Sequence, residues 1–278
     1  MKSNMIRKVA IYGKGGVGKS TVCSNVSAAL SQMGEKVMQV GCDPKRDSIS
    51  TLCGKLMPTI LDKTREAKDI TDEMVRSVIF EGFNGVLGCE SGGPRPGMGC
   101  AGKGVNLALQ LLDKFEVFQK YGVTIVLFDV LGDVVCGGFA QPMRSGYAHE
   151  IYLVTCGEPL TLFQINNIIK AVHKLSSLGS DVGVAGLINN MRGVVHEDRI
   201  VEEFGRLVGV PVIEHIPRSR MVQDAESQGK TVIEAFPDSP QAEVYRRLAQ
   251  KILGNKAIHN PKPITMDDIK TIMARVLS

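Results

Sequence analysis

The sequence lacks several features that would place it in a common functional class. Its net charge is only +4 over 278 residues, which does not favour binding to nucleic acid or to a charged membrane surface. The longest apolar runs, at 123–128 and 182–188, are too short to cross a bilayer. We find no internal repeat and no low-complexity tract. These absences predict an ordinary globular chain with no nucleic-acid partner and no membrane partner.

The amino terminus lacks the apolar core of a signal peptide. It starts with basic residues and continues into a strand-like run and a glycine-rich loop, so we expect a cytoplasmic protein. The seven cysteines include no CxxC pair and are odd in number, which argues against a framework of disulfides. Packing as a small buried hydrophobic residue is the ordinary role for any one of them.

Short apolar runs alternate with longer amphipathic stretches. Strands are expected at 7–12, 36–40, 85–89, 123–128, 150–155, 182–188 and 211–214. Helices are expected near 20–33, 71–79, 104–118, 160–177, 196–208, 219–227, 239–253 and 266–276. This alternation predicts an α/β fold, a doubly wound, mostly parallel sheet with helices on both faces.

The carboxyl-terminal part of the chain holds the one connector rich in proline and lysine, at 254–265. We expect it to carry the last helix over the surface or onto a partner subunit. The even alternation of strand-like and helix-like segments elsewhere predicts a single domain over 1–278, with 254–278 as a carboxyl-terminal extension.

The first expected strand leads into a complete phosphate-binding loop. The sequence GKGGVGKST fits G-x-x-x-x-G-K-[ST] in its required setting, after a strand and before a helix. Lys19 is expected to reach the β- and γ-phosphates, and Ser20 to bind Mg²⁺. The candidate nucleotide-binding residues of this loop are Gly13, Lys14, Gly15, Gly16, Val17, Gly18, Lys19, Ser20 and Thr21. The fold is therefore expected to be that of a P-loop NTPase.

Lys14 is a second lysine inside the loop. This variant resembles the dimeric branch of P-loop ATPases, which includes ParA/MinD-type partitioning proteins, arsenite pump ATPases and iron–sulfur carriers. In that branch the lysine reaches the nucleotide of the other subunit and stabilises phosphate charge when two subunits close. The resemblance predicts a homodimer with Lys14 as a catalytic residue. A solvated loop lysine is the alternative.

Acidic residues follow the second and fourth expected strands, at the edge where parallel sheets bind ligands. Asp43, Lys45 and Asp47 follow the second strand, and Asp129 and Asp133 follow the fourth. Asp129 is expected to hold Mg²⁺ through water, while Asp43 and Asp47 are placed to orient the attacking water or the metal shell. Asp43 and Asp133 are the candidate catalytic carboxylates. Each aspartate, taken alone, could instead cap a helix or form a turn.

Two cysteines lie in glycine-rich segments, Cys100 in GMGCAG and Cys136 in DVVCGG. We expect each segment to open a helix, where the amino-terminal dipole favours thiolate and the exposed N–H groups can bond to cluster sulfides. A [4Fe–4S] cluster needs four thiolates, and a two-fold homodimer would supply them from these two residues. From spacing alone, buried structural cysteine remains the alternative.

Five segments together resemble the nitrogenase iron protein family and its light-independent chlorophyll-pathway relatives. They are AIYGKGGVGKST, VGCDPKRDS, CESGGPRPGMGCAGKG, FDVLGDVVCGGFA and NPKPITMDDI. The resemblance implies an ATP-dependent reductase in which Cys100 and Cys136 of two copies hold one bridging [4Fe–4S] cluster. It also implies a low-potential electron donor such as ferredoxin or flavodoxin, and a heteromeric nitrogenase-like catalytic component as acceptor.

The resemblance also implies roles for single residues. Asp43 matches the carboxylate associated with hydrolysis, and Asp129 the one associated with Mg²⁺. Segment 129–136 matches the switch that links nucleotide to cluster, and segment 43–48 the switch that faces the partner. The residues expected to enclose the adenine base are Asn190, Pro217, Arg218, Gln223, Glu226 and Gln241.

The sequence departs from the nitrogenase type at several points. Lys103 replaces an arginine that can be ADP-ribosylated in many family members, and segment 51–62 is more similar to the chlorophyll-pathway relatives. These departures favour a reductase that serves a substrate other than dinitrogen. Dinitrogen reduction remains one of the candidate activities. The other candidates are nickel-tetrapyrrole cyclisation, carbon–sulfur cleavage in methylthio compounds and tetrapyrrole ring reduction. An iron–sulfur carrier and a non-redox positioning ATPase are the alternative classes.

Overall fold

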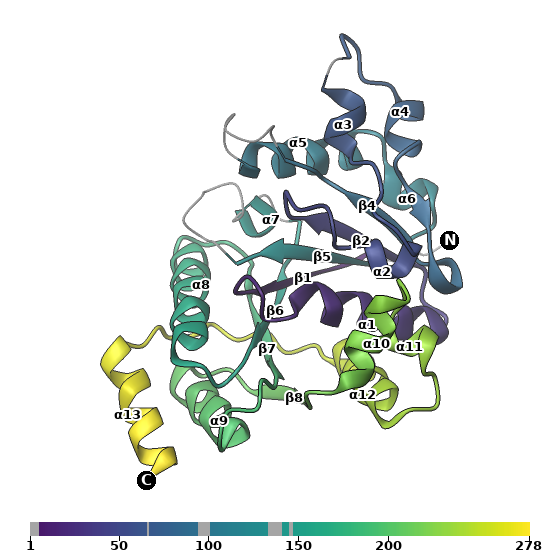
Figure 1. Cartoon of the computed structure of the whole chain (residues 1–278). Helices are drawn as coiled ribbons and strands as arrows, with labels where there is room; N and C mark the ends of the chain where they lie inside the picture. Colours follow the sequence, from purple (N-terminus) through teal and green to yellow (C-terminus); the bar gives the residue numbers. More distant parts are fainter. Residues whose placement is uncertain (1–5, 66, 94–100, 133–140, 145–146) are drawn as a thin grey trace.

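The computed structural model describes residues 6–65, 67–93, 101–132, 141–144 and 147–278, in which strands and helices alternate (Figure 1). The strands are β1 Arg7–Gly13, β2 Val37–Cys42, β3 Phe80–Glu81, β4 Leu87–Glu90, β5 Ile125–Leu131, β6 Glu150–Thr155, β7 Gly183–Asn190 and β8 Val212–Ile216. The helices are α1 Lys19–Gln32, α2 Ser50–Cys53, α3 Ile60–Thr64, α4 Asp72–Arg76, the 3₁₀ turn η1 Phe83–Gly85, α5 Ala101–Lys114, α6 Val117–Lys120, α7 Gln141–Arg144, α8 Pro159–Ser177, α9 Glu197–Val208, α10 Arg220–Ser227, α11 Val232–Ala235, α12 Pro240–Gly254 and α13 Met266–Leu277.

Within the described ranges the strands form one eight-stranded sheet, in the order β3-β4-β2-β5-β1-β6-β7-β8. All neighbouring strands pair in parallel except the short edge strand β3, which runs antiparallel to β4. The central strand β1 lies between β5 and β6. Strands β2 to β5 all lie on one side of β1, and the chain then crosses to β6 on the other side. A crevice for a ligand forms where the strand order reverses in this way. The predicted α/β class and doubly wound sheet are confirmed.

Each face of the sheet carries its own layer of apolar side chains. On one face, Val22 and Leu30 of α1 pack with Tyr245 and Leu248 of α12. On the other face, the buried side chains come from α5, α8, α9 and α13, with Phe204 as one of the largest. Figure 1 shows α1 grouped with α10, α11 and α12 away from α8, α9 and α13. With both faces covered, the strands are apolar along most of their length, as the sequence pattern required.

Some element ends differ from the sequence prediction. Strands β2, β5 and β7 each continue two or three residues further toward the ligand edge than expected. The single helix expected over 104–118 is wrong: the structure has α5 and α6, separated by Glu116 with a positive φ of 50°. That left-handed conformation breaks the α-helical hydrogen-bond ladder, although the apolar periodicity continues through it.

The carboxyl-terminal segment is fastened to the sheet before it reaches α13. His259 and Val184 exchange two backbone hydrogen bonds of 2.9 Å, and Asn255 donates to the Ala185 carbonyl at 3.0 Å. Helix α13 then packs against α8 and α9 of the same chain. This packing agrees with the predicted course over the chain's own surface, and the course onto a partner subunit stays a prediction. Among the helices that the structure describes, none combines the length and apolarity needed to cross a membrane.

Candidate nucleotide-binding site

The phosphate-binding loop connects the central strand β1 to α1. Gly16 and Gly18 have φ values of 80° and 87°, which residues with a side chain rarely adopt. A Cβ at Gly18 would lie 2.4 Å from Nδ2 of Asn190, and that amide donates to the Val17 carbonyl at 2.7 Å. The loop therefore holds a shape that only glycine permits, with its backbone open to an incoming phosphate group.

Lys19 forms an ion pair with Asp129 at the base of the loop. Both side chains are buried, with exposures of 5% and 0%, and Lys19 Nζ contacts Asp129 Oδ1. Burial acts to lower the pKa of Lys19, but the adjacent Asp129 carboxylate outweighs burial and raises it. The second oxygen, Asp129 Oδ2, has no hydrogen-bond partner among the described residues. A fixed lysine and a free buried carboxylate oxygen suit a phosphate chain and a metal ion.

The segment after β2 divides into a buried and an exposed part. Asp43 is buried, and its carboxylate accepts a 2.9 Å hydrogen bond from the Lys45 backbone N–H. Burial raises the pKa of Asp43, although that hydrogen bond and the charge of Lys19 act to lower it. Lys45 and Asp47 are exposed, and Asp47 lines a small cavity beside Ser20 and Thr21. Only Asp43 of this group is enclosed next to the loop.

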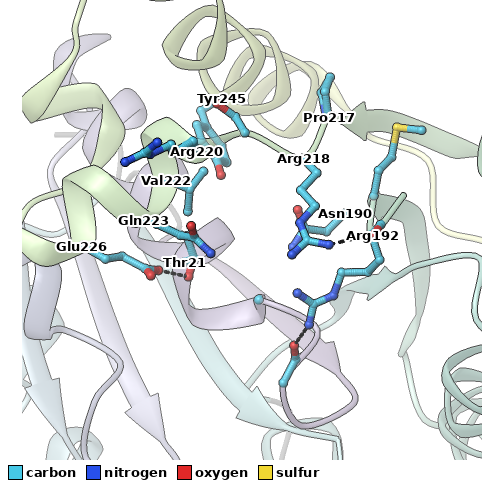
Figure 2. Close-up of a pocket in the computed structure, with 14 residues that line it drawn as sticks. Thr21, Asn190, Arg192, Pro217, Arg218, Arg220, Val222, Gln223, Glu226 and Tyr245 are labelled. Atoms are coloured by element: carbon cyan, nitrogen blue, oxygen red, sulfur yellow. Dashed lines mark hydrogen bonds between the residues drawn. The ribbon is translucent and has the colours of Figure 1, made fainter. Parts of the chain in front are cut away.

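A cavity of about 440 Å³ opens beside the loop, between the end of β7 and α10 (Figure 2). It brings together residues from parts of the chain more than 150 positions apart. Of the predicted site residues it contains Gly16, Gly18, Thr21, Asn190, Pro217, Arg218, Gln223 and Glu226. Glu226 accepts a 2.6 Å hydrogen bond from the Thr21 hydroxyl, which joins α10 to α1 across the floor of the cavity. Most of the predicted base-binding residues thus share one cavity with the phosphate loop.

Gln241 is the predicted base-binding residue that does not line this cavity. It is buried at the start of α12 and hydrogen bonds to Tyr245, and Tyr245 takes the place at the cavity wall. An α-helix presents residues four positions apart on the same face, so Gln241 lies beside the cavity-lining Tyr245, and its role at the base stays a prediction.

Sequence reasoning predicted Arg218 in this cavity but missed the other two arginines that line it, Arg192 and Arg220. The Arg192 guanidinium contacts the Gly16 carbonyl of the phosphate loop, and Arg218 donates to the Arg192 carbonyl at 3.1 Å (Figure 2). Two positive charges therefore lie above the loop on the side of Asn190. Arg192 is only two residues beyond Asn190. Its position just after β7 was therefore the sequence signal that could have identified it as a site residue.

The five described cysteines do not have the properties of cluster ligands. Burial raises the pKa of the Cys23, Cys42 and Cys89 thiols, and it raises that of Cys53 to about 11. Burial also raises the pKa of Cys156. Metals bind the thiolate form, and no cluster of metal-binding side chains occurs in the described part of the chain. The predicted ligands Cys100 and Cys136, and the predicted catalytic Asp133, lie outside the described residues.

Comparison with known sequences gives one family over nearly the whole chain. The profile of the family described as 4Fe-4S iron sulfur cluster binding proteins, NifH/frxC family, matches residues 7–277. The chain belongs to the NifH/frxC family. The nitrogenase iron protein 2 of Methanobacterium ivanovii is 48% identical over 264 residues, which cover 95% of this chain and 97% of that protein. The nitrogenase iron protein 2 of Paenibacillus durus is 46% identical over 266 residues, 95% of this chain and 90% of that protein.

Solved structures show the same fold at lower identity. The cell division ATPase MinD of Pyrococcus furiosus superimposes with a TM-score of 0.68 at 24% identity, covering 90% of this chain and 99% of that chain. A ParA family ATPase of Chlorobium tepidum gives a TM-score of 0.69 at 16% identity, covering 89% and 99%. At this identity the likeness shows the P-loop ATPase fold of this NifH/frxC protein and nothing about its redox chemistry.

Family membership accounts for the predicted cofactors. The NifH/frxC proteins bind a [4Fe–4S] cluster and use MgATP. The described residues fit the nucleotide through the glycine loop, Lys19 and the free oxygen of Asp129. They also fit a cluster held elsewhere in the chain, because burial raises the pKa of every described cysteine thiol.

Proposed function

We propose that this chain is the ATP-dependent reductase component of a nitrogenase or nitrogenase-like system. Two copies would form a homodimer and hold one [4Fe–4S] cluster through Cys100 and Cys136 of each. The cluster would supply one electron at a time to a heteromeric catalytic partner, after reduction by a ferredoxin or flavodoxin. The family, the nucleotide cavity and the lack of other suitable cysteines among the described residues support this proposal.

The observation that carries the proposal is the contact between the phosphate loop and the segment that leaves β5. A Cβ at Gly132 would lie 2.2 Å from the Gly13 carbonyl oxygen, so the two backbones touch there. The side-chain amide of Gln164, on α8, donates to the Gly132 carbonyl at 2.7 Å and fixes this point from the other side. Cys136 follows four residues later in the sequence. A change at the nucleotide loop would therefore act directly on the chain that carries Cys136.

The buried residues of the site would divide the work of ATP hydrolysis. Lys19 would neutralise phosphate charge, and Asp129 would hold the metal ion through its free oxygen with Ser20. Asp43 would accept the proton of the attacking water while the bond from the γ-phosphorus to the bridging oxygen breaks. A raised pKa favours that proton transfer. Lys14 would neutralise further phosphate charge on the nucleotide of the other subunit, so that hydrolysis depends on the dimer.

The test is to purify the protein without oxygen and measure iron and labile sulfide per dimer. Electron paramagnetic resonance (EPR) of the dithionite-reduced protein, with and without MgATP, then reports on coupling. About four iron atoms per dimer are expected, with a signal that MgATP alters. Cys100→Ser or Cys136→Ser should remove the cluster, whereas Cys53→Ser, a matched control at a half-buried thiol, should retain it. A cluster without a MgATP response would favour the iron–sulfur carrier, and a protein without iron would favour a positioning ATPase.

A further inference from the structure

The chain that leaves β4 makes a second set of contacts with the nucleotide side of the protein. Residues 90–93 end the described part before the segment that contains Cys100. The Ser91 N–H donates to the Gly41 carbonyl at 2.8 Å, and the Ser91 carbonyl accepts from the Leu61 N–H at 3.3 Å. These bonds place Ser91 between the end of β2 and α3.

Glu90 is a fully buried carboxyl group at the end of β4, with an exposure of 0%. Its Oε1 accepts a 2.8 Å hydrogen bond from the Ile49 N–H. Its Oε2 has no partner within the described ranges and lies where a Cβ of Gly41 would be, at 1.9 Å. A half-satisfied buried carboxyl is costly, so a purely structural site would be expected to carry an apolar residue here.

The hydrogen bond that Glu90 accepts from Ile49 fixes the far end of the segment that begins with Asp43. Next to Ile49, the Ser48 carbonyl accepts from Gln39 at 2.9 Å and from the Ser24 hydroxyl at 2.9 Å. Gln39 is itself fully buried in β2. Residues 43–47 are therefore joined at one end to the nucleotide site through Asp43, and anchored at the other by buried polar groups.

Pro44 brings this segment into contact with the chain that leads to Cys100. A Cβ at Gly93 would lie 2.7 Å from Pro44 Cβ and 3.2 Å from Pro44 Cα. On the other side, the Gly93 carbonyl accepts a 2.7 Å hydrogen bond from Arg65. Pro44, which is bonded directly to Asp43, therefore packs closely against Gly93, and the hydrogen bond from Arg65 holds Gly93 from the other side.

We propose that Glu90 is a positioning residue that holds the Asp43–Ser48 segment against Gly93, so that the nucleotide state is transmitted to the Cys100 segment as well as to the Cys136 segment. The inference rests on the proposed function. Each cluster ligand would then be linked to the nucleotide by its own contact. The contact of Gly13 with Gly132 would serve Cys136, and the contact of Pro44 with Gly93 would serve Cys100.

The proposed connection is mechanical, and a rigid contact transmits a shift only if both of its sides are held. Glu90 holds one side through Ile49, and Arg65 holds the other. Glutamine can accept the same hydrogen bond from Ile49, whereas alanine cannot. The two substitutions therefore separate the hydrogen bond from the acidity of the side chain.

The experiment compares Glu90→Ala and Glu90→Gln with the wild-type protein and with Glu214→Ala. Glu214 is a matched control, because it is also a buried glutamate in the sheet but bonds to Arg247 and Lys251 at β8, away from the nucleotide cavity. Each protein is titrated with MgATP, and the EPR signal of the reduced cluster is recorded with and without nucleotide.

We expect Glu90→Ala to lose most of the MgATP-induced change in the cluster signal, while its MgATP affinity stays within about fivefold of wild type, the lower end of a typical allosteric coupling, because Glu90 does not line the nucleotide cavity. Glu90→Gln and Glu214→Ala should keep the change. A full response in Glu90→Ala, or an equal loss in Glu214→Ala, would overturn the inference alone. Absence of a cluster or of any response in the wild type would overturn the proposed function, and this inference with it.

A second pair of variants covers the case in which Glu90→Ala does not fold. Gly93→Ala should alter the MgATP response by pushing against Pro44, and the added substitution Pro44→Gly should restore it because the opposing Cβ is gone. Restoration in the double variant is a coupling that independent sites would not show. Additive effects of the two substitutions would exclude the contact as a route between nucleotide and cluster.

Discussion

The Lys19 ammonium group contacts the Asp129 carboxylate where the phosphate loop meets the end of β5, and both side chains are buried. Each of these charges is compensated by the other. Removing one partner of a buried ion pair leaves an uncompensated charge in a medium of low polarity. Loss of either partner alone is therefore expected to destabilise the protein.

Lys19→Met should destabilise the nucleotide-free protein by about 3–5 kcal/mol, because it strands the Asp129 carboxylate. Adding Asp129→Asn should recover much of that loss. Urea unfolding at neutral pH measures both changes. Lys251→Met is the control, since Lys251 is half exposed in its pair with Glu214 and should cost less than about 1 kcal/mol. An equally small loss in Lys19→Met would contradict the idea that the buried pair stabilises the empty site.

Gly18→Ala should damage the phosphate loop even without nucleotide. A left-handed alanine and the lost bond from Asn190 to the Val17 carbonyl together should cost about 2 kcal/mol, as the Cβ would fall 2.4 Å from Asn190 Nδ2. Gly15→Ala is the matched control, because a Cβ there meets nothing within 4 Å. Thermal unfolding should separate the two variants. Equal melting temperatures would mean that the loop can adopt another shape at no cost.

The sheet and its ligand edge could be predicted from the sequence, but the strand ends could not. Apolar runs locate β5 and β7 correctly, yet both strands continue through buried polar residues, Asp129 in β5 and Asn189 in β7. The apolar pattern ends at such residues because it depends on the polarity of side chains. The strand continues past them because its backbone still pairs with the neighbouring strands. Functional polar side chains on buried strands therefore shorten a predicted strand at the place where the site begins.

The candidate site was predictable to the extent that a local motif marks it. The phosphate loop, Asp43 and Asp129 each follow a strand expected from the sequence in a recognisable pattern, and the structure brings them together. Glu90 follows a strand as well, but an isolated glutamate gives no indication that it will be buried beside Ile49 and Gly41. Its environment is created by pairing β2 with β4 across 50 residues of sequence, which no local pattern records.

Arg192→Ala should weaken ATP binding, since the Arg192 guanidinium contacts the Gly16 carbonyl and lies over the phosphate loop. Loss of a charged hydrogen bond of about 1.5–3 kcal/mol corresponds to a drop in affinity of roughly 10-fold or more. Arg220→Ala is a suitable control, because Arg220 also lines the cavity but points away from its centre (Figure 2). Its side chain is 89% exposed and pairs with Asp224. Calorimetric titration with ATP tests the pair. Equal affinity losses would indicate a general effect of positive charge, without a specific role for Arg192.

Glu90 should make the stability of the protein depend on pH in the neutral range. Burial raises its pKa from 4.5 to about 8, although the hydrogen bond from Ile49 acts to lower it. Three carboxylates add to the rise: Asp129, Asp47 and Asp43. The folded protein therefore retains a proton that the unfolded chain releases. The stabilisation is complete below about pH 4.5, and it is lost as the pH rises toward the folded pKa of about 8.

Glu90→Gln removes this titration and keeps the hydrogen bond. Relative to the variant, the wild-type protein should lose up to about 1.4 kcal/mol of unfolding free energy for each pH unit between these two values. Urea unfolding at pH 6 and at pH 8 measures that difference, and all other titrating groups cancel in the comparison. Glu214→Gln should show no such decline, because hydrogen bonds from Arg247 and Lys251 outweigh burial and lower the pKa of Glu214. Parallel pH profiles for wild type and Glu90→Gln would mean that Glu90 is already ionised in the folded protein.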